Sequence, residues 1–282
     1  MRIIYAKCEA MANLLEIAKD TMGILEQGYY INSRNKRQEV SPWLQAAVAN
    51  TTLYTPAALD KLLASFKPDA RFTTAFEVTN ETTLDAARRL GNEAEVAALN
   101  FASAKNPGGG FLRGASAQEE SIARASGLYS CLLQAEEYYR YHRTLGTCLY
   151  SDHMIYSPAV PVFKYDDGRL MDEVLPLTVV TSAAVNAGVV AQQEKNNIAQ
   201  IEPVMRLRVN KLLALLATKR QHTLILGAWG CGVFQNDPRM IAGLFHEALL
   251  GKFENCFQRV VFAVKTNNEN MIAPFRELFL PS

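Results

Sequence analysis

NPGGGFLRGASAQEE occupies residues 106–120, shortly after the apolar stretch AALNFA of residues 97–102. Its three consecutive glycines, at positions 108–110, can take positive φ and expose backbone amides without a Cβ in the way. In α/β sheets, ligands bind where loops leave the carboxyl ends of strands, and a following helix N-terminus attracts anions. The stretch therefore predicts a strand, a ligand-binding turn and a helix over residues 117–142.

Strand and helix patterns alternate on both sides of this turn. Runs of β-branched and aromatic residues predict strands, and apolar residues at helical spacing predict helices. The strands expected are residues 72–79, 95–103, 154–165, 175–185, 222–229 and 259–266, with Pro158, Pro161 and Pro176 interrupting two of them. The other helices expected are residues 82–92, 197–219 and 238–253. This alternation predicts a layered α/β domain.

The first quarter of the chain has a different pattern. Residues 1–27 carry apolar positions at helical spacing, and residues 55–66 predict a short helix with Thr55 as its N-cap. We therefore predict a helical extension over residues 1–69, followed by the α/β domain over residues 70–282.

A second glycine-rich turn, LILGAWGCGVFQNDP at residues 224–238, also follows a strand and precedes a helix. Its glycines are spaced G-x-x-G-x-G, which matches neither the dinucleotide fingerprint nor the phosphate-binding loop with Gly-Lys-Ser/Thr. Such a turn is still a natural cradle for a diphosphate. Phe234 is either a core residue or a wall against a sugar. The two turns together predict a nucleotide-like ligand, with its diphosphate on residues 230–234 and a sugar beside residues 108–120.

Glu119 and Glu120 are adjacent carboxylates at the start of the predicted helix. Ser116 and Glu119 fit the S-x-x-E pattern of a capping box, so Glu119 either completes the helix start or binds the ligand. Glu120 lies nearly opposite the apolar stripe of the helix and faces a cleft or solvent. A helix N-terminus favours the ionised carboxylate. A general acid at this position therefore needs burial or a bound anion to keep its proton.

The composition is that of a globular protein with an ordinary core. Of the 282 residues, 49% are hydrophobic and 20% are charged, and the formal net charge is +1. A polyanionic ligand must therefore be held by local geometry, and we expect no DNA binding. Charged residues interrupt the N-terminal stretch and no apolar run is long enough to span a bilayer, so we expect no signal peptide and no membrane contact.

Cysteine and histidine usage argues against a disulfide framework and a metal site. The five cysteines include no C-x-x-C pair, which favours reduced thiols and a cytoplasmic location. The HEALL stretch at residues 246–250 lacks the second histidine of H-E-x-x-H, so we expect no metal. No histidine stands at a sequence position that would pair it with Cys231 as a base. Cys231 is therefore expected to be an inert thiol rather than a nucleophile.

LNFASAKNPGGGFLRGASAQEESIARASGLY, residues 99–129, resembles the signature of the bacterial-type (microbial) poly(ADP-ribose) glycohydrolases, a branch of the macrodomain fold. Three glycines followed after a short spacer by Gln-Glu-Glu are the hallmark of this family. The resemblance continues through EVTNETTLDAARRL, YSPAVPVFKYDDG, VVTSAAVNAG and GAWGCGVFQNDP, and so covers most of the chain. It implies a three-layer α/β/α macrodomain with a mixed sheet and an N-terminal helical extension. It also implies hydrolysis of the ribose–ribose O-glycosidic bonds of poly(ADP-ribose) without a cofactor.

The resemblance further implies roles for individual residues. Glu120 is expected to protonate the departing ribose oxygen and then to activate water, and Glu119 is expected to hold the ribose hydroxyls. The expected substrate-binding residues are Asn106, Gly108, Gly109, Gly110, Gln118, Gly230, Cys231, Gly232, Val233 and Phe234. Among these, residues 230–233 would give amides to the diphosphate, and Phe234 would orient the terminal ribose. Residues 78–83 are a candidate region for adenine contacts.

Three other functions share parts of this pattern. A macrodomain that binds ADP-ribose without cleaving it needs the glycine turns but not Glu120. An enzyme that removes single ADP-ribose units or acyl groups is the second alternative, and a platform for protein partners is the third. The expected partners are poly(ADP-ribose) or ADP-ribosylated proteins, with ADP-ribose as the product.

Overall fold

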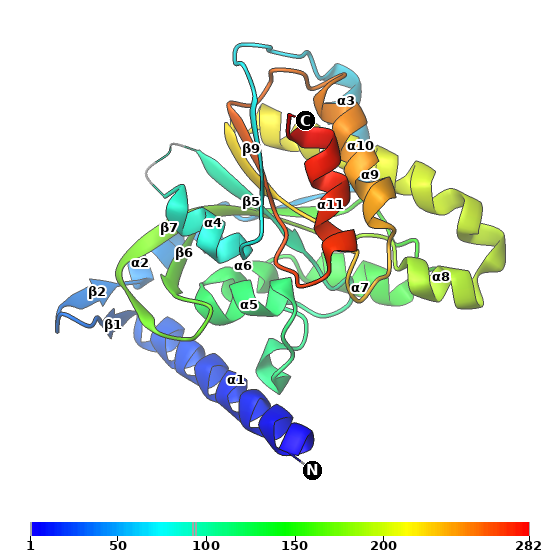
Figure 1. Ribbon diagram of the computed structural model, residues 1–282. Coiled ribbons are helices and arrows are strands. Elements are labelled where there is room, and N and C mark those ends of the chain that lie inside the picture. Colours follow the sequence, from blue (N-terminus) through cyan, green and yellow to red (C-terminus); the bar gives the residue numbers. More distant parts are fainter. Residues whose placement is uncertain (1, 92, 94, 282) are drawn as a thin grey trace.

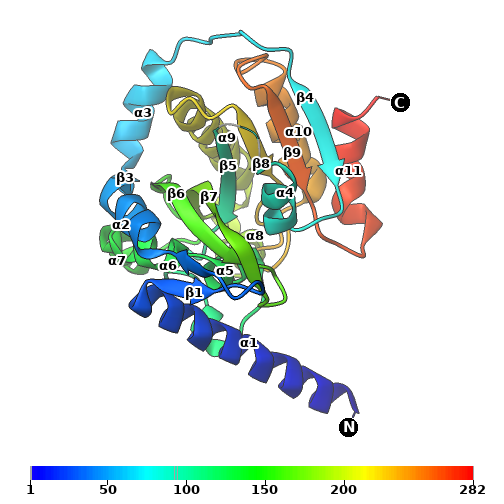
Figure 2. The ribbon, with the colours of Figure 1, turned by 90° about the vertical axis from the view of Figure 1, so that its left-hand side faces the viewer.

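The computed structural model describes residues 2–91, 93 and 95–281, and for residues 2–10 and 12 it describes the backbone alone. Its centre is a seven-stranded mixed sheet in the order β3-β6-β7-β5-β8-β9-β4 (Figures 1 and 2). The strands are β3 (Thr52–Tyr54), β4 (Ala75–Thr79), β5 (Val96–Phe101), β6 (Met154–Lys164), β7 (Leu170–Ser182), β8 (Thr223–Leu226) and β9 (Arg259–Ala263). Neighbours from β7 to β4 run parallel, whereas β6 is antiparallel to both β3 and β7.

Helices cover both faces of this sheet, each over its own apolar cluster. The helices on one face are α3 (Pro56–Ser65), α8 (Ala187–Gln193), α9 (Ile201–Thr218), α10 (Pro238–Leu249) and α11 (Glu269–Phe279). The helices on the other face are α2 (Ser41–Asn50), α4 (Thr83–Arg89), α5 (Gln118–Ala125), α6 (Leu128–Leu133) and α7 (Glu136–Thr144). This confirms the predicted three layers with a mixed sheet.

The two glycine-rich turns leave the same edge of the sheet. Strands β5 and β8 are parallel neighbours, paired from Val96 with Thr223 to Ala98 with Ile225. Because their carboxyl ends lie side by side, the turn after β5 and the turn after β8 face each other below the sheet (Figure 1). The order of the strands therefore brings the two predicted ligand-binding turns to the same edge of the sheet.

The helix predicted over residues 117–142 is wrong as one element, because the chain forms three short helices there. Ser126 is extended, with φ −150° and ψ 176°, and makes an isolated bridge with Val162 of β6. Its hydroxyl donates to the carbonyl oxygen of Ile122 at 2.7 Å. The break turns the chain away from α5, so that α6 and α7 lie against the sheet as separate segments.

The prolines predicted to interrupt the strands lie within continuous β6 and β7 instead. Pro161 of β6 faces Pro176 of β7 in the antiparallel register, and a bulge follows Ser157, where Ala159 takes φ +49°. A bulge removes ladder hydrogen bonds locally, so it accommodates residues that cannot donate. Strand β7 also begins at Leu170, earlier than the predicted start at residue 175.

The N-terminal segment contains more than helices. Helix α1 (Arg2–Gln27) agrees with the helix predicted over residues 1–27, and the hairpin of β1 (Tyr29–Ile31) and β2 (Arg37–Glu39), which was not predicted, follows it. Strand β3 then joins the main sheet beside β6. The helix predicted over residues 55–66 is confirmed as α3. The boundary at residue 69 stays a prediction, and residues 1 and 282 lie outside the described residues.

Helix α1 is anchored to the body beneath α5. Lys164 of β6 is fully buried and binds the Asp20 carboxylate at 2.8 Å and the Thr21 hydroxyl at 2.8 Å. The Thr21 hydroxyl also contacts the backbone carbonyl of Arg124 in α5. Ala18 packs with Phe111 and Ala123 in a small apolar cluster. Through these contacts α1 supports both the first glycine turn and the helix that carries the two glutamates.

Candidate active site

Glu120 is bound by the backbone of the turn that precedes it. The Gly110 N–H donates to Glu120 Oε1 at 2.9 Å, and the Ala117 N–H donates to Oε2 at 3.0 Å. Helix α5 begins at Gln118 with Ala117 as its N-cap, so the predicted capping box of Ser116 and Glu119 is wrong. Glu120, the third residue of the helix, bonds to the N-cap amide instead.

Glu119 is the buried member of the pair, with 2% of its surface exposed. The Ser103 N–H donates to its Oε2 at 2.7 Å, and Asn100 Nδ2 donates to its Oε1 at 3.2 Å. Burial outweighs these hydrogen bonds and raises the pKa of Glu119 to about 8. The Glu119 carboxyl is therefore mostly neutral at pH 7.

The raised pKa of Glu119 predicts a pH-dependent stability that the Glu119→Gln variant should lack. The folded protein keeps a proton that the unfolded chain loses near pH 4.5, the ordinary carboxyl value. This contribution to the free energy of unfolding is complete below about pH 4.5 and is lost as the pH rises through about 8. Each kcal/mol lost lowers the Tm by about 2–4 °C. Between pH 5 and 9, the Tm of the wild type should fall by more than the Tm of Glu119→Gln. Tm curves that run parallel over this pH range would contradict the prediction.

The middle glycine of the first turn is required by both carboxylates. Gly109 has φ +60°, and a Cβ there would collide with the Glu120 carboxylate and lie 3.2 Å from Glu119 Oε2. Gly108, with φ +66°, packs against the Phe111 ring and does not border the cavity described below. Glycine is required at position 109 because its backbone lies directly against two acidic side chains.

Gln118 holds the start of α5 against the sheet. Its Oε1 accepts the Phe101 N–H at 2.8 Å, and its Nε2 donates to the Leu99 carbonyl at 2.8 Å and to the Thr83 hydroxyl at 3.0 Å. Both amide ends are thus occupied by protein groups from β5 and α4. These bonds fix the position of the two glutamates, while the predicted contact of Gln118 with substrate stays a prediction.

The second glycine turn presents free backbone amides. In the part of the chain that the structure describes, the N–H groups of Gly232, Val233 and Phe234 make no hydrogen bond. Gly230 has φ +72°, and a Cβ there would collide with the Ala184 side chain. The Cys231 amide, in contrast, donates to the Ala228 carbonyl at 3.1 Å. Three adjacent free donors at a turn suit the oxygens of a diphosphate.

The two turns border one cavity of about 420 Å³. The predicted residues that line it are Asn106, Gly109, Gly110, Gln118, Glu119, Glu120, Gly230, Gly232, Val233 and Phe234. Gly108 and Cys231 do not line it, and burial raises the pKa of the Cys231 thiol to about 12, which excludes a reactive thiolate at neutral pH. Sequence reasoning missed Arg113, which also lines the cavity.

A second cavity of about 360 Å³ adjoins the first. Phe101, Ala117, Gln118, Ala228 and Gly232 border both cavities. The second cavity is also lined by residues 81–83, which belong to the predicted adenine region, and by residues 263–266 after β9. The two cavities thus share lining residues, an arrangement that suits a ligand longer than a sugar phosphate.

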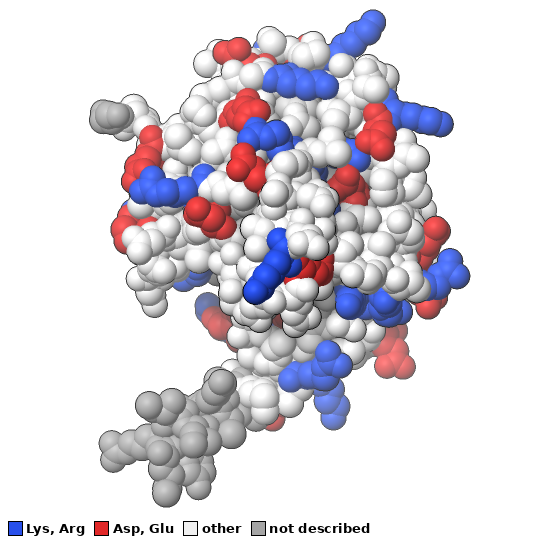
Figure 3. Space-filling view, turned by 90° about the vertical axis from the view of Figure 1, so that its right-hand side faces the viewer, with Lys and Arg blue, Asp and Glu red and all other residues white. Residues whose placement is uncertain are grey.

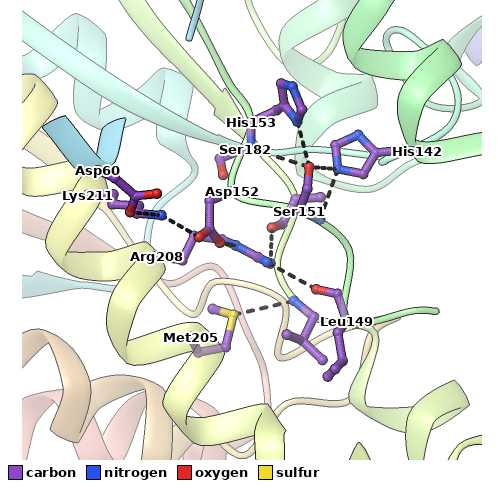
Figure 4. Close-up of polar contacts among 12 residues, drawn as sticks. Asp60, His142, Leu149, Ser151, Asp152, His153, Ser182, Met205, Arg208 and Lys211 are labelled. Carbon is purple, nitrogen blue, oxygen red and sulfur yellow. Dashed lines mark hydrogen bonds and ion pairs between the residues drawn. The ribbon is translucent and has the colours of Figure 1, made fainter. Parts of the chain in front are cut away.

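A buried ion network supports the second turn from behind (Figure 4). Arg208 of α9 is fully buried and donates to Asp152 at 2.9 Å, to the Ala183 carbonyl at 2.8 Å and to the Leu149 carbonyl at 3.0 Å. Lys211, one turn further along α9, binds the second oxygen of Asp152 at 2.7 Å. Burial alone would raise the pKa of Asp152, but Arg208 and Lys211 outweigh it and lower that pKa.

This network reaches the glycine turn through residues 183–185. The Ala184 side chain lies under Gly230, and Asn236 Nδ2 donates both to the Val185 carbonyl at 2.7 Å and to the Gly230 carbonyl at 3.1 Å. Arg208 holds the carbonyl of Ala183, the residue before this contact. The position of the free amides therefore depends on a charge cluster outside the cavity.

The described residues contain neither a cluster of metal-binding side chains nor a helix suited to a membrane. No group of three His, Cys, Asp or Glu side chains lies close enough to hold a metal ion. Nor does any described helix have both the length and the apolar character needed to cross a membrane.

Comparisons with known proteins agree on one family. Residues 18–165 match the family model described as microbial-type PARG, catalytic domain. The poly(ADP-ribose) glycohydrolase (PARG) from Thermomonospora curvata is 42% identical with a TM-score of 0.90, over 94% of this chain and 99% of that one. Its complex with the inhibitor ADP-HPD is 43% identical with a TM-score of 0.87, over 94% and 98%. The glycohydrolase from Deinococcus radiodurans in complex with ADP-ribose is 46% identical with a TM-score of 0.81, over 85% and 98%. A search of curated protein sequences gave no match.

Proposed function

Because the chain belongs to the microbial-type poly(ADP-ribose) glycohydrolases, we propose that Glu120 moves the proton in its reaction and that Glu119 positions the sugar. The reaction is hydrolysis of the ribose–ribose O-glycosidic bonds of poly(ADP-ribose), which releases ADP-ribose. The observation that supports this division of roles is the difference between the two carboxyls. Both line one cavity, but Glu119 is buried and neutral, whereas Glu120 is partly exposed and bound only by backbone amides.

The terminal ADP-ribose unit fits across the two cavities. Its diphosphate would accept hydrogen bonds from the backbone N–H groups of Gly232, Val233 and Phe234. These N–H groups have no other acceptor among the described residues. The adenosine would occupy the second cavity, beside residues 81–83. The terminal ribose would then lie in the first cavity, between the Phe234 ring and the two glutamates, with Asn106 at the same end.

Glu120 is placed to give and take one proton. The Gly110 and Ala117 amides hold its two carboxyl oxygens at the wall of the cavity. A general acid must carry its proton when the substrate is bound. Protonated Glu120 gives its proton to the departing ribose oxygen as the bond to the anomeric carbon breaks and positive charge develops there. The resulting carboxylate removes a proton from the water that attacks this carbon, which restores Glu120.

Glu119 suits a positioning role because it is neutral. A protonated carboxyl can donate to one ribose hydroxyl and accept from another. Most glycosidases flank the bond with two carboxyl groups from separate positions. Here the two glutamates are adjacent in the chain and converge on the backbone of Gly109, so they act from one side of the sugar.

Product analysis tests this function against the alternatives. The purified protein is incubated with poly(ADP-ribose) and, separately, with a protein that carries single ADP-ribose units. We expect free ADP-ribose from the polymer and none from the single units. Binding of polymer without release would indicate a non-catalytic ADP-ribose-binding macrodomain. Release from the single units would indicate a mono-ADP-ribosyl hydrolase.

The cellular location and the chain division are part of the same proposal. Four cysteines, Cys131, Cys148, Cys231 and Cys256, are free thiols, which supports a reducing compartment such as the cytoplasm. Residues 70–282 contain every residue that lines the two cavities, which supports their assignment as the catalytic domain. Residues 1–69 would then serve as a supporting extension.

A further inference from the structure

Arg113 is the one cationic side chain among the described residues that line the catalytic cavity. It ends the short 3₁₀ helix η1 (Phe111–Arg113), which follows the three glycines directly. The backbone N–H of Arg113 donates to the Gly110 carbonyl at 2.8 Å. The backbone N–H of Gly110 donates in turn to the Glu120 carboxylate, so this one residue connects Arg113 with Glu120. The Arg113 side chain is exposed and forms no ion pair with any described residue. An unpaired guanidinium that lines the same cavity as Glu120 is therefore free to bind an anion.

Arg113 lines the first of the two cavities and not the second, so it does not border the space assigned to the adenosine. The end shared with the second cavity is bordered by Phe101, Ala117, Gln118, Ala228 and Gly232, and Arg113 does not line that second cavity. With the adenosine of the terminal unit in the second cavity, the rest of the chain must extend from the opposite end.

The chemistry of the polymer puts a phosphate near this end. The oxygen that Glu120 protonates belongs to a ribose of the next unit, and that same sugar carries a diphosphate on its 5′ carbon. Arginine binds phosphate through two parallel N–H···O bonds, which fix orientation as well as charge. We propose, resting on the function above, that Arg113 binds the diphosphate of the leaving unit and so makes the enzyme prefer polymer over ADP-ribose attached to an uncharged group.

Two further cations, Lys105 and Arg143, lie next to Asn106, which lines the same cavity as Arg113. The Arg143 Nε–H donates to the Lys105 carbonyl at 2.9 Å, which joins the end of α7 to the residue before Asn106. Neither Lys105 nor Arg143 forms an ion pair with a described residue. Figure 3 shows Lys and Arg side chains interspersed with Asp and Glu side chains over the face seen there. Because Lys105 and Arg143 carry unpaired positive charge next to Asn106, they suit a polyanion that leaves the cavity.

Two substrates separate this role from a structural one. The first is poly(ADP-ribose), and the second is ADP-ribose joined at its anomeric carbon to an uncharged phenol, whose release is followed by fluorescence. In Arg113→Gln we expect kcat/KM for the polymer to fall about 10- to 100-fold, the range for a hydrogen bond to a charged group. We expect kcat/KM for the phenol substrate to stay within about twofold of the wild type, because a lost phosphate contact leaves it untouched.

Further variants identify the chemical origin of the effect. Arg113→Lys should recover part of the polymer activity, since it keeps the charge but not the forked geometry. Arg113→Gln should also show a weaker dependence of polymer turnover on salt than the wild type. Lys61→Gln, which removes an exposed cation on α3 outside the cavity, is the matched control. This variant should leave kcat/KM unchanged for both substrates.

Each other outcome overturns the proposal. Equal losses on both substrates would mean that Arg113 only shapes the turn, and unchanged polymer kinetics would mean that it contacts no phosphate. Failure of the underlying function looks different, because it would appear as a wild-type protein that releases no ADP-ribose from the polymer.

Discussion

Glu120→Gln should lower the rate of poly(ADP-ribose) hydrolysis by about 10²–10⁴-fold, the usual contribution of a positioned acid–base group. Glutamine keeps the size of the side chain but has no proton to give to the ribose oxygen and cannot activate water. Binding of ADP-ribose should be nearly unchanged, because the free amides of the second turn and the second cavity stay intact. Turnover measured by release of ADP-ribose, together with calorimetry on the same samples, checks both parts.

Glu119→Gln is the matched control for this variant. Glu119 is already neutral at pH 7, so an amide replaces a neutral carboxyl and the loss of turnover should stay within about tenfold. Equal losses in the two variants would contradict the division of roles. A Glu120→Gln protein that keeps most of its activity would remove Glu120 from the chemistry altogether.

Arg208→Met should lower the free energy of unfolding by about 3–5 kcal/mol, the usual cost of removing one member of a buried ion pair. The variant leaves Asp152 with Lys211 alone and leaves the carbonyls of Leu149 and Ala183 without their donor. The midpoint of thermal unfolding should fall by on the order of 10 °C. Below that midpoint, ADP-ribose affinity should fall as well, because the Ala183 carbonyl leads directly to the contact under Gly230.

Arg206→Met on the same helix is the control for Arg208→Met. Arg206 is 37% exposed, compared with 0% for Arg208, and its ion pairs with Glu202 and Glu247 lie at the surface. Surface pairs contribute about 0–1 kcal/mol, so this variant should unfold close to the wild type. Similar unfolding midpoints for the two variants would show that the buried network adds little.

Local patterns were sufficient for most of the fold. Strand β5, its glycine turn and the start of α5 all follow from residue spacing, and the parallel neighbours β5 and β8 bring both turns together. The division at Ser126 was missed because a single glycine inside a helical pattern, here Gly127, is only a weak signal against a continuous helix. The bridge to Val162, far away in the sequence, decides that conformation. Helical spacing also placed Glu120 on the open side of α5, but it could not tell which glutamate would be buried.

Side chains that act through distant partners were the main omission. Arg208 and Lys211 lie among apolar residues of α9, three positions apart, and this pattern signals buried cations. Their partner Asp152 could not be identified, because it lies in a loop that only the folded chain brings to the helix. Arg113 was overlooked for a simpler reason, since one arginine after a glycine run has no distinctive spacing.

The close approach of residue 109 to two acidic groups has a consequence for how this enzyme can diversify. No side chain fits at that position, so a substitution of Gly109 cannot be tolerated next to the two glutamates. Val233, at the opposite rim, is 79% exposed and touches little, and Arg113 also borders open water. New preferences for leaving groups should therefore arise at the mouth of the cavity, while the chemistry beneath it is inherited unaltered.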